Sequence, residues 1–432
     1  MIFYSLIIYA FMFHKQVVGV YSESGKLELV LVHRPGRELE RLTAENKDAL
    51  LFDELPNIEE TRKSHDIFVN TLRKEGVTVL YVLDVLRETL QQSSAARKML
   101  IEGIVHHRQL TEEASSALTQ FLFSFTATQL THAVIEGIAC NKEELGESES
   151  ASILLQTCSS TEEFLVPPLP NLLFTRDSFS IMEKSIFIWR MAKPARSNEP
   201  LIMRVIFTYH THHSQLSMIG IHIIDWETHA DSTATVEGGD VAYLGRGKLL
   251  IGNGERTNRA GIEAIERTGL FRQVIAIELP KTRDYMHLDI VLSSTGHHSF
   301  ALHQYLADRL PVYTVQTPRQ SKNSAKTEWL CHGHDIQMAL RHLLCDPDLH
   351  FYDAADEKTS IAEISECREN MLCISDQNVI TYAGDDPIKG VVSQMLHNRQ
   401  HPCHVETFPQ KGLIAGHGGA HCMTNAVSRL LN

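Results

Sequence analysis

The sequence predicts a mixed α/β body into which an all-helical bundle is inserted. Strand-rich segments are centred on the stretches 27–33, 171–188, 236–251, 286–293 and 371–382. Between Pro56 and Pro167 the chain has no proline, and apolar residues recur there at helical spacing. Together these observations predict strands on either side of a helical block. The strand-rich centres share no sequence identity, so they are compatible with a radial repeat without establishing one.

The first elements of the body are a strand, a helix and a second strand. Residues 27–33 are mostly apolar and predict a strand that ends at Arg34-Pro35-Gly36. Residues 58–75 predict a helix, and after Gly76 residues 77–83 predict the next strand. Further along, residues 259–267 and 389–396 predict helices between the later strands.

Residues 84–157 predict the inserted bundle. Three groups of apolar residues at spacings of three and four mark helices in it: Leu100, Ile101 and Ile104; Leu118, Phe121, Leu122 and Phe125; and Leu130, Val134, Ile135 and Ile138. A polar stretch at 141–150 loosens the end of the block. We therefore predict an N-terminal extension at 1–20, a first part of the body at 21–83, the bundle at 84–157, and the remainder of the body at 158–432.

The composition is that of an anionic globular protein. The chain has 432 residues, of which 43% are hydrophobic and 22% charged, so it can bury a sizeable core. These values exclude disordered, collagen-like and polytopic membrane proteins. The 40 basic and 53 acidic residues give a net charge of −13. That charge gives no electrostatic reason to bind nucleic acid or anionic lipid, whereas it would attract small cationic substrates.

The first 13 residues form an apolar run that is too short to span a bilayer. No basic region precedes the run and no small-residue cleavage site follows it. It could be a weak signal anchor, or the start codon could be misplaced, since Met12 lies just ahead of the globular sequence that begins at Tyr21. We favour a cytoplasmic protein with no membrane partner, and we expect a homo-oligomer.

The eight cysteines and 24 histidines have spacings typical of neither a metal site nor a disulfide framework. We expect seven of the cysteines to be buried or idle thiols in a reducing compartment, and one to have a functional role. The run His210-Thr211-His212-His213 could suggest a metal tract, but no cysteine or carboxylate lies at ligand spacing. We therefore predict a loop with surface histidines.

Five polar clusters stand at predicted strand ends or tight turns: 174–177, 237–240, 254–257, 286–289 and 416–422. Each alone has an ordinary structural explanation. An Arg-Asp pair after a strand is commonly a surface ion pair, and Gly238-Gly239 is a turn. The repeats Gly245-x-Gly247 and Gly252-x-Gly254 complete no phosphate-binding fingerprint. The clusters indicate a site only in combination.

Together the clusters supply the parts of a covalent hydrolase site. Cys422 follows a glycine-rich turn that a ligand can approach closely, and a cysteine combined with a histidine is a candidate nucleophile and proton shuttle. His287 lies two residues before Asp289, so on an extended strand their side chains would share one face. Asp177, Asp289 and Glu237 are too acidic a set for an ester or peptide site, but they match a planar guanidinium.

Seven segments of the chain, taken in order, resemble the arginine deiminase family. They are Tyr21-Ser-Glu-Ser-Gly-Lys, Leu31-Val-His-Arg-Pro-Gly, Leu169-Pro-Asn-Leu-Leu-Phe-Thr-Arg-Asp, Glu237-Gly-Gly-Asp, Gly254-Glu-Arg-Thr, Met286-His-Leu-Asp and His421-Cys-Met-Thr. The resemblance runs from about residue 21 to the end of the chain. It implies a pentein fold, which is a five-bladed α/β propeller, with a helical bundle inserted after the first unit.

The resemblance also implies roles for the matching residues. Cys422 corresponds to the nucleophile that attacks the guanidinium carbon and forms an amidino-cysteine intermediate. His287 corresponds to the acid and base, and Glu237 to its carboxylate partner. Asp177 and Asp289 correspond to the pair that holds the guanidinium nitrogens.

The remaining matches concern the rest of the substrate. Asn171, Arg196 and Arg256 correspond to substrate-binding residues, with the two arginines at the α-carboxylate. No metal and no organic cofactor is implied, and water is the second substrate. The implied reaction is the hydrolysis of L-arginine to L-citrulline and ammonia, the first step of arginine degradation by the deiminase pathway.

One position departs from the family pattern. Five residues before the nucleophile, where arginine is usual as a further carboxylate contact, this chain has His417. We expect His417 to bind the substrate α-carboxylate best as imidazolium, so that KM for arginine rises between about pH 6 and about pH 8. The alternative is that His417 merely fills the loop while Arg196 and Arg256 hold the carboxylate.

Other hypotheses stay open beside arginine hydrolysis. The same covalent step could act on a different guanidino or ureido compound. The chain could also be a non-catalytic pentein that acts as a binding module, although the complete set of chemical groups argues against this. A zinc protein that uses the many histidines is the remote fourth hypothesis.

Overall fold

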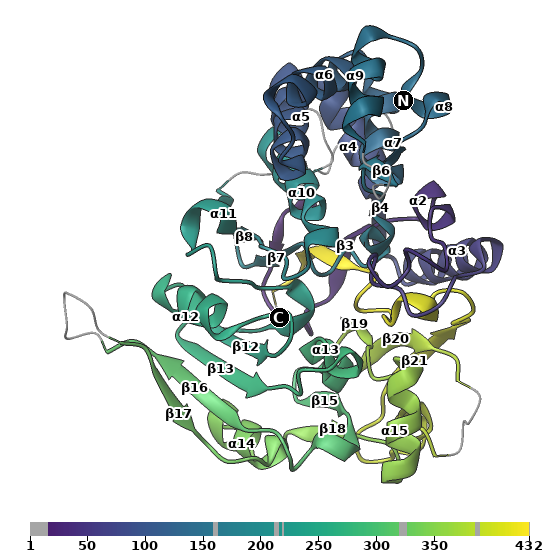
Figure 1. Cartoon of the computed structure of the whole chain (residues 1–432). Coiled ribbons are helices and arrows are strands. Elements are labelled where there is room, and N and C mark those ends of the chain that lie inside the picture. Colours follow the sequence, from purple (N-terminus) through teal and green to yellow (C-terminus); the bar gives the residue numbers. More distant parts are fainter. Residues whose placement is uncertain are drawn as a thin grey trace, which may run out of the picture.

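The computed structural model describes residues 16–158, 163–210, 216–217, 220–318, 326–384 and 389–431. Helices gather at one end of the molecule, above a body of short sheets with further helices around it (Figure 1). The fold is a mixed α/β fold, as the sequence predicts.

The helical layer consists mainly of consecutive helices: α4 (Val82–Gln92), α5 (Ser94–Arg108), α6 (Glu112–Phe123), α7 (Ala127–Glu136), α8 (Lys142–Leu145) and α9 (Glu149–Thr157). A hydroxyl side chain just before α5, α6, α7 and α9 accepts a hydrogen bond from the first turn, where backbone N–H groups otherwise lack partners. Leu100, Leu118 and Leu130 are buried on α5, α6 and α7. The three predicted helices are therefore confirmed, except that Phe125 lies beyond the end of α6 and Ile138 lies in strand β5.

One helix of the layer comes from outside the predicted block. Helix α10 (Asn198–Tyr209) packs on α4 and α5. Its residues Ile202, Val205 and Ile206 are buried. The predicted block 84–157 omits this helix, because periodicity marks the buried face of a helix but not the partner that covers it.

Among the described residues, five sheets share one pairing pattern, in which two antiparallel strands are followed by a third strand parallel to the second. The strand sets are β22 (Asn425–Arg429), β3 (Leu27–Val32) and β4 (Thr78–Tyr81); β7 (Phe179–Met182), β8 (Ser185–Ile188) and β10 (His222–Asp225); β11 (Val241–Gly245), β12 (Lys248–Asn253) and β13 (Gln273–Glu278); β14 (Leu292–Gly296), β15 (Ser299–Leu302) and β18 (His350–Tyr352); and β19 (Leu372–Ser375), β20 (Asn378–Tyr382) and β21 (His404–Phe408). Strands β16 (Val312–Gln316) and β17 (Glu328–Cys331) extend the third set.

A helix lies in the connection between the two parallel strands of each set, because parallel strands need a long crossover. These helices are α3 (Ile58–Lys74), α10, α12 (Arg259–Arg267), α14 (Ile336–Leu344) and α16 (Val391–His397). The predicted helices 58–75, 259–267 and 389–396 are thereby confirmed to within a few residues. The shorter elements are β1 (Gln16–Val17), β2 (Gly19–Val20), β5 (Ile138–Ala139), β6 (Phe164–Val166), β9 (Leu216–Ser217), α2 (Arg37–Glu40), α11 (Trp226–His229), α13 (Leu288–Val291) and α15 (Glu357–Ser365).

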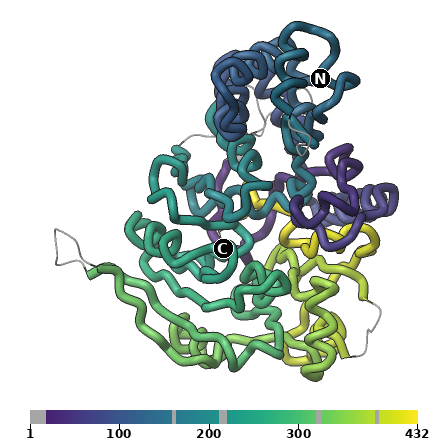
Figure 2. Tube along the Cα trace, viewed as in Figure 1, coloured from purple at the N-terminus to yellow at the C-terminus, as the bar shows by residue number. Residues whose placement is uncertain are grey.

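The first and last strands of the body lie in one sheet. Strand β22 pairs with both β2 and β3, so the purple start of the trace runs beside its yellow end (Figure 2). Val18 and Val20 are buried in the core, so the predicted extension at 1–20 ends earlier than residue 20. Residues 1–15, with the apolar run, lie outside the described residues. In the described ranges, no helix has the length and apolar character needed to cross a bilayer.

The histidine run is only partly described. His210 is buried, and its Nδ1 lies 2.9 Å from Thr89 Oγ1. The prediction of a surface histidine is therefore wrong at this position, because His210 follows the last residue of α10 and its side chain lies against Thr89 of α4. Residues 211–213 lie outside the described residues.

A disulfide joins Cys140, which follows β5, to Cys158 at the end of α9. The Cα atoms are 5.9 Å apart, and the two residues are separated by 18 positions. The expectation of idle thiols is therefore wrong for this pair. No short motif connects them, and the packing of α8 against both β5 and α9 brings the cysteines together.

We expect this disulfide to stabilise the helical layer. Closing a loop of this size restricts the unfolded chain and is worth about 3 kcal/mol. The double variant Cys140→Ser/Cys158→Ser should therefore lose about 3 kcal/mol in the free energy of unfolding, measured by denaturant titration without reductant. Dithiothreitol should destabilise the wild type by a similar amount and leave the variant unchanged. An equal effect of dithiothreitol on both proteins would contradict the assignment.

Candidate active site

A pocket lies beside the loop that precedes β22. It is lined by Leu51, Asn171, Phe174, Asp177, Arg196, Arg256, Arg283, Met286, His287, Gly416, His417, Gly418 and Cys422. Seven of the nine residues predicted for the site are among these. The other two, Glu237 and Asp289, are hydrogen-bonded to His287 and Cys422. The structure therefore brings all nine residues together at one place.

His287 is held between buried carboxylates. Its Nε2 lies 2.8 Å from Glu237 Oε2, and its Nδ1 lies 3.7 Å from Asp177 Oδ1. Burial alone would lower the pKa of this ring, but the carboxylates of Asp177, Glu237 and Asp240 raise it to about 9. The imidazole is therefore protonated at neutral pH and can give a proton to a leaving group.

Glu237 is fixed in its ionised form. It is buried, and Oε2 accepts a hydrogen bond from Arg256 Nη1 at 3.1 Å, while Oε1 accepts one from the backbone N–H of Ala192 at 3.0 Å. Burial would raise the pKa of Glu237, but Arg256 and His287 hold it far below its usual range. The anion therefore orients His287 and stabilises the imidazolium.

The two glycines after Glu237 allow this close approach. They begin a short 3₁₀ turn, Gly238–Asp240. A Cβ on Gly239 would lie 2.8 Å from Cγ of His287 and 2.9 Å from Asp177 Oδ1. The N–H of Gly239 donates to Asp177 Oδ1 at 3.1 Å. The Glu-Gly-Gly-Asp motif thus supplies a carboxylate and the space that its histidine partner needs.

Cys422 is buried directly beside a carboxylate. It is 3% exposed, and its Sγ lies 3.4 Å from Asp289 Oδ2. Burial, together with the charges of Asp289 and Asp177, raises the pKa of the thiol well above its usual value. The sulfur is therefore protonated until a cation offsets these carboxylates.

His287 and Asp289 do not share one face of a strand, so that prediction is wrong. Residues Leu288–Val291 form the short helix α13, and β14 begins only at Leu292. The backbone N–H of Leu288 donates to Asp240 Oδ1 at 2.9 Å. This carboxylate comes from a distant segment and caps the helix, which local spacing cannot indicate. As a result His287 reaches Glu237 while Asp289 reaches Cys422.

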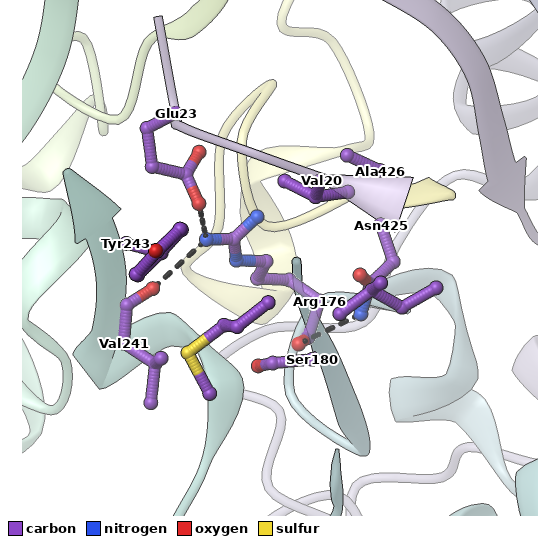
Figure 3. A pocket seen from close by; sticks show the side chains of 10 residues that line it. Val20, Glu23, Arg176, Ser180, Val241, Tyr243, Asn425 and Ala426 are labelled. Carbon is purple, nitrogen blue, oxygen red and sulfur yellow. Dashed lines mark hydrogen bonds and ion pairs between the residues drawn. The ribbon is translucent and has the colours of Figure 1, made fainter. Parts of the chain in front are cut away.

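A second buried network, which the sequence does not assign, lies behind Asp289. His421 Nδ1 is 2.8 Å from Asp289 Oδ2, and its Nε2 is 3.3 Å from Glu23 Oε2. Glu23 pairs with Arg176, whose guanidinium also donates to the Val241 carbonyl at 2.9 Å (Figure 3). Burial would raise the pKa of Asp289, but the hydrogen bond from His421 lowers it. The sequence does contain a signal for this network, because Glu23, Arg176 and His421 all stand in the segments that resemble the arginine deiminase family.

Arg196 is engaged by the protein. Its guanidinium donates to Asp177 Oδ2 at 2.6 Å and to the Glu199 carboxylate at 2.9 and 2.7 Å. Its Nη2 also donates to the backbone carbonyls of Asn171 and Phe174. Most donors of Arg196 therefore have partners, and its contact with a substrate carboxylate stays a prediction.

Other polar groups complete the pocket wall. Arg256 is buried, and the Asn171 side chain donates to the Leu50 carbonyl at 2.6 Å. Arg283, which no sequence pattern indicates, lies in the 3₁₀ turn Arg283–Tyr285 and forms an ion pair with Asp53. Burial lowers the pKa of His417. Its φ of +59° lies in the left-handed region, which helps the loop turn into the pocket.

Three buried polar atoms at the site have no hydrogen-bond partner in the described part of the chain: Asp289 Oδ1, Arg256 Nε and His417 Nε2. Buried polar groups are normally paired, so a ligand is expected to supply the missing partners. The free acceptor on Asp289 suits a cationic N–H donor, and the free N–H of Arg256 suits an anion. The pocket therefore fits a small molecule with a planar cationic group and an anionic group.

Within the described ranges, two groups of side chains lie close enough to share a metal ion: Asp177, Glu237 and His287; and Glu75, His404 and Glu406. In the first group Asp177 is paired with Arg196 and Glu237 with Arg256. A metal ion there would face two guanidinium groups and a protonated imidazole. In the second group His404 and Glu406 form an exposed ion pair.

The chain matches known proteins along most of its length. The family profile described as arginine deiminase matches residues 48–429. Arginine deiminase from Listeria monocytogenes serovar 1/2a is 28% identical over 422 residues, which cover 96% of this chain and 98% of that protein. Arginine deiminase from Rhodococcus opacus is 36% identical over 302 residues, which cover 69% and 72%.

A solved structure shows the same kind of fold. It is an amidinotransferase from Microseira wollei that superposes with a TM-score of 0.53 and 14% identity, over 96% of this chain and 98% of that one. At this identity the likeness concerns the fold alone. The profile match, in contrast, spans the pocket residues from Leu51 to Cys422. The chain belongs to the arginine deiminase family.

Proposed function

We propose that this chain hydrolyses L-arginine to L-citrulline and ammonia through a covalent amidino-cysteine intermediate, as the first step of arginine degradation by the deiminase pathway. One observation carries the proposal: the buried thiol of Cys422 lies 3.4 Å from Asp289 Oδ2, in a pocket that also holds Asp177 and the protonated His287. Membership of the arginine deiminase family supports the same reaction.

The substrate guanidinium is bound between Asp177 and Asp289. Asp289 Oδ1 has no partner among the described residues, and Asp177 Oδ1 keeps a lone pair beyond its bond with Gly239. A guanidinium offers five N–H donors in one plane and so can satisfy both carboxylates. Its charge also offsets the two anions that keep Cys422 protonated, so binding and activation of the thiol are coupled.

In the first half-reaction the Cys422 thiol, with the guanidinium bound, releases its proton to solvent, and the resulting thiolate attacks the guanidinium carbon. A C–S bond forms and the carbon becomes tetrahedral. The imidazolium of His287 then protonates one terminal nitrogen, the C–N bond breaks, and ammonia leaves. What remains is a positively charged amidino group on sulfur, and His287 is now neutral.

In the second half-reaction the neutral His287 takes a proton from water as its oxygen adds to the same carbon. The C–S bond then breaks and its electron pair returns to Cys422 as thiolate. The protonated ureido group loses its extra proton to solvent, which gives citrulline. His287 is again an imidazolium, and once citrulline leaves, the thiolate takes up a proton from solvent, so the resting site is restored.

The substrate α-carboxylate is bound by Arg256 and His417, whose Nε and Nε2 atoms have no partner among the described residues. Asn171 and Arg196 also line the pocket and complete the proposed substrate-binding set. Because Arg196 holds Asp177 Oδ2 at 2.6 Å, we assign it the further task of orienting that carboxylate.

We also propose that the five strand sets are the blades of a pentein propeller. The repeated pattern of an antiparallel pair followed by a parallel strand supports this, and so does the sheet in which β22 joins β3. In this arrangement the bundle at 84–157 interrupts a propeller made of 21–83 and 158–432. We further propose that the protein is a cytoplasmic homo-oligomer and that it binds no nucleic acid.

Replacing Cys422 with alanine should abolish the formation of citrulline and ammonia from arginine, because it removes the attacking atom. Cys331→Ala removes an exposed thiol and is the matched control, which should keep full activity. Quenching the wild type during turnover should leave an amidine adduct on Cys422 that mass spectrometry detects.

Agmatine, which lacks the α-carboxylate, should be a poor substrate. Activity in Cys422→Ala, or equal turnover of agmatine and arginine, would sink the proposal.

The release of ammonia should slow as the pH rises through about 9. His287 acts there as an acid, and its pKa of about 9 means that the proton is present at neutral pH and lost above that value. Single-turnover measurements from about pH 7 to about pH 10 would follow this loss. Glu237→Gln removes one of the charges that raise the pKa, so its decline should begin at lower pH. Glu406→Gln, at an exposed ion pair, is the control. Coincident profiles for wild type and Glu237→Gln would contradict the assignment.

KM for arginine should increase with pH in the acidic range. Burial lowers the pKa of His417, so the imidazolium exists only in acidic solution, and its contact with the α-carboxylate weakens as the proton is lost. The increase is therefore expected at lower pH than the unperturbed value of about 6.5 would give. His417→Arg keeps a charge at every pH and should flatten the increase, with about fivefold lower KM at about pH 8. Superimposable KM profiles would show that His417 makes no such contact.

A further inference from the structure

Asn370 is a buried residue that contacts the nucleophile and that the proposed mechanism has not yet used. It lies in the loop between α15 and β19 and is 0% exposed. Its side-chain Nδ2 is 3.2 Å from Cys422 Sγ and 3.1 Å from the backbone carbonyl of Asp289. Its Oδ1 is 3.0 Å from the backbone N of Cys422 and 3.1 Å from that of Gly419.

The bonding partners fix which way the amide points. Oδ1 faces two backbone N–H groups, and these can only donate. The opposite side of the amide faces a carbonyl oxygen, which can only accept. In the reversed orientation the NH2 group would face the two backbone N–H groups, and the amide oxygen would face the carbonyl oxygen of Asp289. The NH2 group of Asn370 must therefore be the part that lies against the sulfur.

The other close polar partner of the sulfur has the opposite character. Asp289 Oδ2, at 3.4 Å, can accept a proton from a thiol but repels a thiolate. Among the side-chain hydrogen bonds to Sγ in the described part of the chain, the one from Asn370 supplies an N–H donor, and the backbone N–H of Gly419 also lowers the pKa of the thiol. That contact therefore favours the ionised sulfur over the neutral one.

The titratable groups that face Cys422 come from several elements. They are Asp289 from α13, Asp177 from the segment after Phe174, Cys367 from the loop that also carries Asn370, and Tyr382 from β20. His421 acts through Asp289, to which it is hydrogen-bonded. The side chains with the largest effect on the thiol, Asp289, Asp177 and Cys367, all disfavour a thiolate. The imidazolium of His287 and the guanidinium groups of Arg196 and Arg256 line the same pocket, where they are paired with carboxylates.

We propose that Asn370 is a catalytic residue of this chain, whose amide N–H stabilises the Cys422 thiolate. The proposal deepens the proposed function and rests on it. The N–H acts when the thiol loses its proton before attack. It acts again when the C–S bond breaks in the second half-reaction and the electron pair returns to Sγ. Its two accepted bonds hold the loop from Gly419 to Cys422 in place at the same time.

The packing around Asn370 fits this task. A Cβ on Gly419 would lie 2.8 Å from both Cβ and Oδ1 of Asn370. Glycine at this position therefore lets the amide reach under the loop. The backbone carbonyl of Asn370 also accepts a hydrogen bond from the N–H of His421 at 3.3 Å. The residue is thus bonded to three of the four residues that end in the nucleophile.

Two variants test the proposal. Asn370→Asp keeps the shape and the oxygen that the backbone N–H groups need, but replaces the donor with an acceptor. Asn370→Ala removes the donor without adding charge. The pH dependence of Cys422 alkylation by iodoacetamide, followed by peptide mass spectrometry without substrate, measures thiolate formation. The exposed Cys331 in the same molecule serves as the internal reference. Both variants should move the Cys422 midpoint upward by about one pH unit or more.

Steady-state kinetics provide a second readout. Both variants lose one hydrogen bond to the charged thiolate. The usual strength of such a bond predicts that kcat for arginine falls by about 10- to 150-fold, while KM changes by less than about threefold. Asn425→Asp is the matched control. Asn425 is also buried and donates to the carbonyls of Thr175, Arg176 and Phe179, but not to the sulfur. This variant should lower Tm without moving the alkylation midpoint.

The outcomes separate the possible readings. A shifted midpoint in both Asn370 variants, with none in Asn425→Asp, supports the proposal even if a variant has a lower Tm. Unchanged midpoints, with loss of Tm alone, would overturn it and leave Asn370 a structural residue. A shift in Asn370→Asp but not in Asn370→Ala would overturn it as well, because added charge would then be the cause. If the wild type hydrolysed no arginine, the proposed function would fail while the alkylation result still judged Asn370.

Discussion

The buried negative charge around Cys422 is the constraint on which the rest of the site depends. Asp177, Asp289, Glu237 and Glu23 are each at most 6% exposed, and a buried carboxylate without a partner costs more than one hydrogen bond returns. Each therefore has a guanidinium or imidazole against it: Arg196 for Asp177, His421 for Asp289, Arg256 and His287 for Glu237, and Arg176 for Glu23. Because these pairs share members, the site is one electrostatic network, and removal of one partner would be felt by its neighbours.

The pairing of charges in this network is nearly complete, and the part that stays incomplete has a chemical use. Asp289 Oδ1 lacks a partner in the described part of the chain, and the carboxylates keep the Cys422 proton in place. A cationic guanidinium supplies both a hydrogen-bond donor and a compensating charge, while the neutral ureido group of citrulline can supply the donor but not the charge. The site thus binds the charge that the substrate has and the product lacks, which favours product release. The same argument explains why a protein of this kind needs no exposed, permanently reactive thiolate.

Local patterns in the sequence predict the elements well, and long-range contacts poorly. Helix α12 matches residues 259–267 because Asn258 caps it and its apolar face has the helical period. Eight of the nine predicted site residues stand in the polar clusters or the family-like segments, which a reading of the sequence can find, and Arg196 stands outside them. The turn at His287 was mispredicted because its cap, Asp240, comes from another segment. The partners of Arg196, the Cys140–Cys158 pair and the contact of Asn370 with sulfur follow from tertiary packing, which no local spacing encodes.

The residues that hold the Cys422 loop in place come from widely separated parts of the chain. The backbone carbonyl of Cys422 accepts a hydrogen bond from Arg176, and Thr175 Oγ1 bridges the carbonyls of Leu31 and Met423. Strand β22 then pairs with β3, near the start of the chain. Most of these contacts span well over a hundred residues, so they can form only after the intervening sheets have placed their ends close together. The geometry of the sulfur is therefore set by the whole fold, and a distortion in any of the sheets that meet at this loop would reach the nucleophile directly.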